Sequence, residues 1–458
     1  MRYDISQFAR HFNLYTELRF QENRVTSISC NDGTITTNTK SANSGVSARV
    51  GYKGRSGFSS SSVWADDTVA VIIKEAESHA LFLGSKANVP EYNYFPKEFK
   101  IEKSFATTKR RYSQQEIVEL VRDLDNYIVR NFPNLKGRSV MLVTLDMEKV
   151  LLTSTKSYAH TLTPRTVVSI VLRAEGKDGM ISVGDRMGGL GQVEDVLDNP
   201  QTFYSKIDKL HQQLLDKKEA VYAKAGFADV ILNADLAGIL AHEAIGHTTE
   251  ADLVMAGSVA GDYLNKKVAS ELVTLVDFAH EAFGEILPIP VYVDDEGVIA
   301  SDTTIIEKGV LKNFMHNKES ANHFGVAPTG NARAFSFSDE PLIRMRNTVI
   351  LPGNDKLSEM IASIENGYYL MKRSNGQADA TSEFMFGVPV GYEIKNGKIG
   401  RAIKDTTISG VAFDVLKTVT MVSDDFSCAG VSFCGKKQMM PTGMGGPAIK
   451  CKLNIGGK

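Results

Sequence analysis

Two histidines five positions apart, set in an otherwise apolar helical pattern, constrain the fold of this chain more than any other feature. Residues 240–247 read Leu-Ala-His-Glu-Ala-Ile-Gly-His, whereas the familiar zinc-binding helix spaces its histidines four positions apart. Five residues turn an ideal α-helix by about 500°, so His242 and His247 would point about 140° apart. A π turn brings the two rings back to one side, and Gly246 lowers the cost of that distortion. The sequence therefore predicts a π bulge, and a straight helix through His247 would exclude a site that uses both rings.

An undistorted helix offers a second interpretation of the same segment. Glu243, His247 and Glu250 fall at i, i+4 and i+7 on one helical face and could ligate a metal through one nitrogen and two oxygens. A third interpretation is that the histidines simply pack in a helix and are satisfied by hydrogen bonds. We favour the histidine pair, because a hydrolytic zinc site requires imidazole ligands beside an unligated carboxylate.

A catalytic zinc site also needs a third protein ligand and an open position for water. The sequence leaves these candidates open: Glu250, Asp252, His280, His316, His323 and the C-terminal cysteines Cys428, Cys434 and Cys451. Cys434 stands out, because Gly435 allows close backbone approach and the cation of Lys436 favours a thiolate. The ordinary expectation for a single cysteine is nevertheless a buried structural thiol. Candidates for an oxyanion donor, each equally suited to a structural role, are His316, His323 and Arg333.

Charge and cysteine content narrow the possible functions. The chain of 458 residues carries 52 Lys and Arg against 54 Asp and Glu, a net charge of -2, which gives no general attraction to nucleic acid or anionic membranes. The one compact basic run, residues 109–111, is expected to be solvated. Four cysteines are too few for a disulfide scaffold, the first residues do not resemble a signal peptide, and no apolar stretch approaches the roughly 20 residues of a membrane span. We therefore expect a cytoplasmic protein that binds neither nucleic acid directly nor a membrane.

The pattern along the chain predicts an α+β protein in three regions, residues 1–112, 113–225 and 226–458. The first region is β-rich, with hairpin turns at residues 31–33 and 53–54. A covering helix is expected over residues 68–79, with Asp66 and Asp67 as capping residues. Residues 81–112 show no sustained period and are expected to form a linker or an extended arm.

The middle region begins with a capping box of Ser113 and Glu116 ahead of an apolar helical stripe. The elements expected next are strands at 140–144, 149–153 and 166–172, a glycine-rich loop at 184–191 and a helix at 200–224. No Lys-Ser/Thr follows the loop, which argues against a nucleotide site. Beyond the histidine-bearing helix, strands are expected at 272–278, 290–293, 303–307, 310–315, 348–351, 388–394 and 398–403. With hairpin turns at 308–309 and 396–397, they predict a large, mostly antiparallel sheet.

Several further motifs accompany the histidine segment. They are Glu250, Asp294-Asp295-Glu296-Gly297, Pro328-Thr329-Gly330-Asn331-Ala332-Arg333, Arg344-Met345 with Asn347, Leu351-Pro352-Gly353 and Cys434-Gly435-Lys436. Together these residues resemble the TldD/PmbA family, on its TldD-like side, whose members have long been described as modulators of DNA gyrase. The resemblance runs nearly end to end. It implies that His242, His247 and Cys434 bind zinc and that Glu243 is the general base.

The resemblance also bears on the type of subunit. PmbA-type (TldE) partners lack the histidine motif, so a chain that keeps it is similar to the active subunit. One position departs from the pattern: many relatives have glycine before the glutamine that follows Cys-Gly-Lys, whereas this chain has Lys437 before Gln438. The ligand is unaffected, and the shape of that loop is left open.

The resemblance further implies a fold, a substrate class and partners. Members of the family look like cytoplasmic zinc peptidases that accept unfolded or small peptides within a dimer enclosing the site, and their C-terminal domain is built on a large curved sheet. The expected partner is a second copy or a PmbA/TldE-like paralogue. The alternative is a gyrase-modulating or toxin–antitoxin adaptor without hydrolytic activity, and a lesser one is a metal-dependent amidase acting on a non-peptide amide.

Overall fold

Long paired strands dominate the N-terminal part. The computed structural model describes residues 5–86, 92–374 and 376–457, and its first sheet has seven strands in the order β3-β2-β1-β5-β6-β4, with β7 also paired to β6. These strands are β1 (Tyr15–Asn31), β2 (Thr34–Tyr52), β3 (Arg55–Ser61), β4 (Phe99–Ser104), β5 (Gly137–Thr153), β6 (Ser157–Gly176) and β7 (Gly179–Leu190). Both predicted hairpin turns are present, with positive φ at Asp32, Gly33, Lys53 and Gly54.

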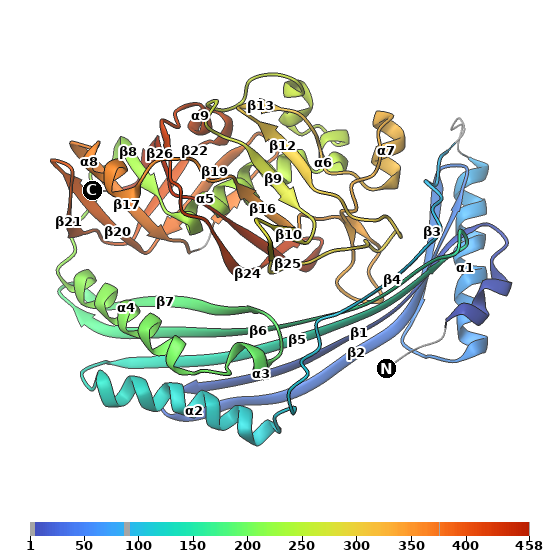
Figure 1. Ribbon diagram of the computed structural model, residues 1–458, viewed down its shortest axis with the longest axis horizontal. Coiled ribbons are helices and arrows are strands. Elements are labelled where there is room, and N and C mark those ends of the chain that lie inside the picture. The colour runs from blue at the N-terminus through green and yellow to red at the C-terminus, as the bar shows by residue number, and fades with distance from the viewer. Residues whose placement is uncertain (1–4, 87–91, 375, 458) are drawn as a thin grey trace.

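Helices cover one face of this sheet (Figure 1). Around Arg19 of β1 and Arg49 of β2, the opposite face contacts the C-terminal part. The helical segments are η1 (Ser6–His11), α1 (Asp66–Ser85), α2 (Gln114–Asn131), α3 (Val193–Val196) and α4 (Gln201–Lys218). Alternate strand residues point at the helices and form two apolar clusters, one under α1 and one under α2 and α4. The predicted capping box is confirmed: the Ser113 side chain accepts from the Glu116 backbone N–H, and the Glu116 side chain accepts from that of Ser113.

Two expected breaks in the sheet are absent. Residues 140–144 and 149–153 belong to one continuous strand, β5, and the predicted loop at 184–191 is mostly β7. A Cβ added to Gly188 would lie 2.1 Å from the carbonyl oxygen of Thr166, so this glycine allows close approach between strands.

The predicted linker and helix limits are also corrected. Residues 99–104 form β4, which pairs with β6, while residues 87–91 lie outside the described residues. The N-cap of α1 is Ala65, without a side-chain cap, and Asp66 and Asp67 occupy the first turn instead. Helix α4 ends at Lys218 rather than near residue 224. The division of the chain at residues 112 and 225 stays a prediction, although β1 pairs with β5 across the first of these positions.

Two further sheets build the C-terminal part. One has nine strands, in the order β18-β19-β22-β26-β8-β17-β20-β21 with β23 on β26, and the other has six, in the order β13-β12-β9-β16-β25-β24. The strands of the nine-stranded sheet are β8 (Gly226–Leu232), β17 (Asn366–Lys372), β18 (Gly376–Ala378), β19 (Glu383–Val388), β20 (Val390–Lys395), β21 (Lys398–Ala402), β22 (Thr406–Val411), β23 (Met421–Val422) and β26 (Ile449–Ile455). Those of the six-stranded sheet are β9 (Leu275–Phe278), β12 (Thr303–Glu307), β13 (Val310–Leu311), β16 (Asn347–Ile350), β24 (Ser427–Lys436) and β25 (Gln438–Gly446).

The predicted α+β class is confirmed, with two large sheets in this part where one was expected. Both predicted turns carry positive φ, at Lys308, Gly309, Asn396 and Gly397. Residues 290–293 are not a strand, and only Val293 forms an isolated bridge. Short two-stranded pairs are made by β10 (Glu281–Ala282) with β11 (Glu285–Ile286) and by β14 (Ala332–Arg333) with β15 (Leu342–Ile343).

A helical segment lies between these two sheets and positions the site. It consists of α5 (Ala234–Ile239), the π-helical η2 (Leu240–Gly246), the 3-10 turn η3 (His247–Thr249) and α6 (Ala251–Met255). It packs against β16 and β25 on one side and against β8, β17, β18 and β19 on the other. The remaining helical elements are η4 (Val259–Tyr263), α7 (Lys318–Phe324), α8 (Leu357–Ala362) and α9 (Ala412–Lys417). No helix within the described ranges is both long enough and apolar enough to cross a membrane.

Buried ion pairs join the N-terminal sheet to the C-terminal part. Lys318 Nζ of α7 lies 3.0 Å from Glu17 Oε1 of β1, and Arg49 of β2 lies 3.1 Å from Glu17 and 2.9 Å from Glu296. Burial alone would raise the pKa of Glu17, but Lys318 and Arg49 hold it below its usual value. We call Glu17, Arg49, Glu296 and Lys318 the junction cluster. The Asp-Asp-Glu-Gly motif of the sequence thus contributes to the contact between the two parts.

Candidate metal centre

The backbone between the two histidines forms the predicted π turn. The Asn233 side chain caps α5 by accepting from the Leu236 backbone N–H, and the helix widens at Leu240. The backbone N–H of His247 donates to the carbonyl of His242, an i→i+5 bond that brings the two side chains to one side. The predicted bulge is therefore confirmed.

Gly246 has a different role from the one that its conformational freedom suggested. Its φ is -57°, an ordinary helical value. A Cβ at this position would lie 2.0 Å from Sδ of Met345, which precedes β16. The glycine therefore makes room for the neighbouring chain segment, so that the π turn can sit against the six-stranded sheet.

The three predicted ligands come together. One ring nitrogen each from His242 and His247 and the sulfur of Cys434 lie within 4.8 Å of one another. Cys434 Sγ lies 3.0 Å from His247 Nε2, although 187 residues separate the two in the chain. Within the described part of the chain, this is the only such group of His, Cys, Asp or Glu side chains. We call His242, His247 and Cys434 the ligand cluster.

Glu243 lies beside the ligand cluster and is more accessible than its members. Its carboxylate oxygens are 3.6 Å from His247 Nε2 and 4.0 Å from His242 Nε2. The Glu243 side chain is 26% exposed, whereas that of His242 is completely buried. A carboxylate at this place can accept a proton from a water molecule next to the cluster.

The residues present fit a zinc ion. Both ring nitrogens of His242 are buried and have no hydrogen-bond partner among the described residues, which is costly unless a ligand uses one of them. Burial holds the pKa of His242 well below its usual value, which favours the neutral ring whose lone pair can bind a metal. Two imidazoles, one sulfur and a free carboxylate match a catalytic zinc site with an open position.

The interpretation in which Glu243, His247 and Glu250 bind one metal does not agree with the geometry. Glu250 Oε2 lies 2.9 Å from Nδ1 of His247, the ring nitrogen opposite the one facing Cys434. Glu243, His247 and Glu250 therefore do not converge on one point.

The other candidates from the sequence have other partners. Asp252 contacts Lys436, His316 Nδ1 lies 3.1 Å from the Ser320 hydroxyl, and Arg333 donates to the carbonyls of Met345 and Pro441. His280 and His323 are absent from the ligand cluster, as are Cys428 and Cys451. No observation assigns an oxyanion donor.

One residue that holds the site was missed by sequence reasoning. Arg344 is completely buried and donates to three carbonyls of the β24–β25 hairpin, those of Cys434, Lys436 and Gln438. No local pattern marks this role, although Arg344 belongs to one of the motifs noted above. Between the last two carbonyls, Lys437 has a φ of 58°, so the hairpin turn keeps a conformation that glycine favours.

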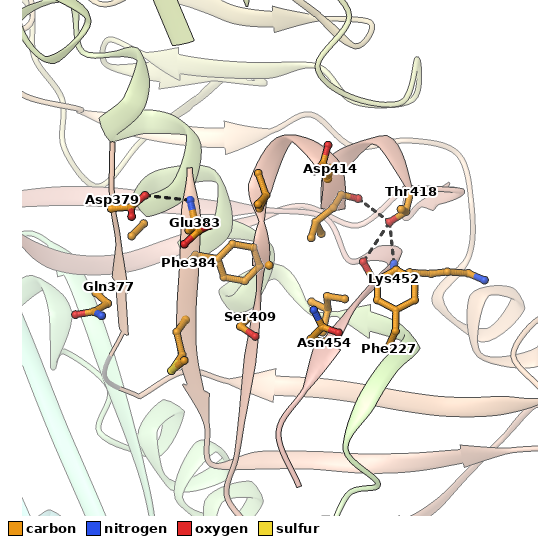
Figure 2. Close-up of a pocket in the computed structure, with 16 residues that line it drawn as sticks. Phe227, Gln377, Asp379, Glu383, Phe384, Ser409, Asp414, Thr418, Lys452 and Asn454 are labelled. Carbon is orange, nitrogen blue, oxygen red and sulfur yellow. Dashed lines mark hydrogen bonds between the residues drawn. The ribbon is translucent and has the colours of Figure 1, made fainter. Parts of the chain in front are cut away.

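A separate cavity of about 750 Å³ lies where β22 and β26 diverge in the nine-stranded sheet (Figure 2). The two strands pair only at Ile408 with Ile455 and at Ser409 with Asn454. Its lining includes exposed Phe227 and several charged residues, but none of the ligand cluster. This cavity is therefore distinct from the candidate metal centre.

Comparison with known proteins agrees with the motifs. Models of the PmbA/TldA metallopeptidase C-terminal domain and domain 1 match residues 225–457 and 16–80. A protein of Buchnera aphidicola subsp. Schizaphis graminum named metalloprotease TldD homolog is 30% identical, over 99% of this chain and 95% of that protein. The zinc metalloprotease TldD homolog of Saccharolobus solfataricus is 35% identical, over 63% of this chain and 64% of its own length.

Solved structures support the same fold. A proposed modulator of a DNA gyrase from Thermotoga maritima has a TM-score of 0.79 at 19% identity, covering 98% of this chain and 97% of that chain. TldE from Thermococcus kodakarensis has a TM-score of 0.73 at 17% identity, covering 98% of each chain. Taken with the family models and the end-to-end relative, these findings mean that the chain belongs to the PmbA/TldD family of metallopeptidases.

Proposed function

We propose that this protein is a zinc-dependent peptidase whose metal is held by His242, His247 and Cys434. The observation that carries the proposal is the fully buried His242, whose two ring nitrogens lack partners among the described residues while the ligand atoms converge beside it. The relatives named metalloprotease support the same activity. Bound there, zinc would polarise a peptide carbonyl and acidify a water molecule.

Glu243 is the proposed proton carrier. Its carboxylate takes the proton of the attacking water and later gives it to the leaving amine nitrogen. Its partial exposure and its closeness to both Nε2 atoms support this role. His242 and Cys434 lie against the core and exclude water from the far side of the site.

The proposed substrates are unfolded or small peptides, and the proposed partner is a second copy or a PmbA/TldE-like paralogue in the cytoplasm. These proposals rest on the family resemblance. The near-neutral charge of the chain argues against direct binding to DNA. An adaptor role in gyrase modulation or in a toxin–antitoxin system, without hydrolysis, is the alternative.

One observation favours a second candidate function. Cys434 Sγ lies 3.0 Å from His247 Nε2, and Glu250 lies 2.9 Å from Nδ1 of the same ring. Nucleophile, base and orienting carboxylate in this order are the arrangement of a cysteine hydrolase. This arrangement leaves the unpartnered His242 without a purpose, which is why we prefer the zinc peptidase.

Metal analysis combined with one substitution tests the proposal. We expect protein purified without chelator to contain about one zinc per chain and to cleave an unstructured peptide. Glu243→Gln should keep the zinc and lose hydrolysis by roughly 10²–10⁴-fold, because the proton carrier is gone. The matched control is Glu271→Gln, an exposed glutamate paired with Lys267, which should be fully active.

Each other result contradicts a different part of the proposal. Zinc-bound protein in which Glu243→Gln still cleaves peptide at the wild-type rate contradicts the assignment of Glu243. Hydrolysis that survives removal of zinc but is lost in Cys434→Ser supports the cysteine hydrolase. Protein with neither zinc nor hydrolysis supports the adaptor.

A further inference from the structure

A buried carboxylate and a lysine link the two chain segments that carry the ligand cluster. Glu250 is completely buried and follows η3, three residues after His247. Its Oε2 lies 2.9 Å from His247 Nδ1 and accepts from Lys436 Nζ at 3.1 Å. Lys436 lies on β24, two residues after Cys434. The η2–η3 segment and β24 are thus joined by two neighbouring contacts, one between Glu250 and Lys436 and one between His247 and Cys434.

The strand geometry explains why the two contacts occur together. Residues i and i+2 of a strand point to the same face, so the side chains of Cys434 and Lys436 both face the η2–η3 segment. One reaches Nε2 of His247 and the other reaches the carboxylate behind Nδ1. Lys436 also donates to Asp252 at 2.8 Å and to the carbonyl of Ile343 at 3.0 Å, which fixes its ammonium group.

The backbone around Glu250 is held as firmly as its side chain. Its N–H donates to the carbonyl of His247, and the flanking residues Thr249 and Ala251 exchange backbone hydrogen bonds with Met315. The carboxylate therefore has a fixed position relative to the imidazole. A carboxylate that accepts from one ring nitrogen of histidine orients the ring and leaves the lone pair on the other nitrogen.

We propose that Glu250, held by Lys436, is a positioning residue that orients His247 so that Nε2 would be available to a bound metal. This inference rests on the proposed function, since it names the residues that orient one of the three proposed ligands. A buried ion pair of this kind adds little net stability by itself, so a role beyond folding better explains its presence beside a ligand. Lys436 balances the charge of Glu250 and ties the position of His247 to the strand that carries Cys434.

The test measures zinc binding and the geometry around the metal, separately from hydrolysis. Glu250→Gln keeps the size of the side chain and removes its charge, and we expect its zinc dissociation constant to rise about 10–100-fold. The absorption bands of the cobalt-substituted protein should shift, because His247 is no longer held in one orientation. The matched control is Asp252→Asn, which alters the other carboxylate of Lys436 and should leave both readouts close to wild type.

The outcomes separate this inference from the function on which it rests. Wild-type zinc affinity and an unchanged cobalt spectrum in Glu250→Gln, or an equal loss in Asp252→Asn, overturn the positioning role while leaving the zinc peptidase intact. Wild-type protein that binds no zinc overturns both. If circular dichroism shows that metal-free Glu250→Gln does not fold, Lys436→Met is tested instead. Weaker zinc binding by this variant supports the inference, and unchanged binding overturns it.

Discussion

The junction cluster and the ligand cluster are both buried groups of polar side chains, but their atoms are satisfied differently. In the junction cluster, Glu17 has cationic partners at 3.0 and 3.1 Å, and Arg49 has a second anionic partner at 2.9 Å. In the ligand cluster, both nitrogens of His242 lack partners within the described residues. Charges that pair with one another hold two parts of a chain together, whereas a buried imidazole without partners costs stability until a ligand uses it.

The two clusters are also held in place by different interactions. The junction cluster depends on the charges themselves. The ligand cluster depends on groups around it, namely the π turn, the contact between Gly246 and Met345, and the carbonyls held by Arg344. Substitutions in the junction cluster should therefore mainly lower stability, whereas substitutions in or around the ligand cluster should mainly weaken zinc binding.

Removal of one junction charge should have the largest effect on stability. Lys318→Met leaves Glu17 buried with less compensating charge, and we expect the free energy of unfolding in urea to fall by about 3–5 kcal/mol. The zinc content of the folded protein should not change. Lys267→Met is the control, because Lys267 forms an exposed pair with Glu271 and its loss should leave the stability nearly unchanged. A similar small effect for both variants would show that the junction charges do not join the two parts.

A substitution in the π turn should have an intermediate effect. In an ordinary helix, Gly→Ala stabilises, but a Cβ at Gly246 would overlap Sδ of Met345. We expect Gly246→Ala to lower the free energy of unfolding of the metal-free protein by roughly 1–3 kcal/mol and to weaken zinc binding. The control Gly435→Ala lies on β24, where the added Cβ would be 3.6 Å from Met439 Sδ, an ordinary contact. A stabilised Gly246→Ala would contradict the close packing of the turn.

The sequence predicted the site better than the sheets. The spacing of His242 and His247 was sufficient to predict a π turn, because an ordinary helix cannot bring the two rings together. The proposed third ligand, Cys434, followed from the family motif. The contact between Glu250 and Lys436 could not be predicted, because 186 residues separate them and no local pattern connects them.

The errors in the N-terminal sheet have a physical cause. Strand β5 appeared as two strands because Asp146 and Glu148 interrupt its apolar residues. Both side chains are buried and paired: Asp146 accepts from Gln192, and Glu148 accepts from Arg24 and contacts His160. The partners come from distant positions, so a local pattern shows a break where the structure has none. Strand β4 was missed for the same reason, since its pairing with β6 is not local.

The smallest expected change in stability provides the sharpest comparison. His242→Leu removes a buried imidazole without partners and replaces it with an apolar side chain of similar size, so the metal-free protein should be as stable as wild type or more stable by about 1 kcal/mol. Zinc binding should be lost. The control Asn331→Leu makes the same kind of change at a buried position whose amide donates to Asp277 and Arg344, and it should cost roughly 1–3 kcal/mol because those partners are left unsatisfied. The measurement is the free energy of unfolding of the two metal-free variants in urea. A loss in His242→Leu as large as that in Asn331→Leu would mean that His242 supports the fold, and the contrast between the two clusters would fail.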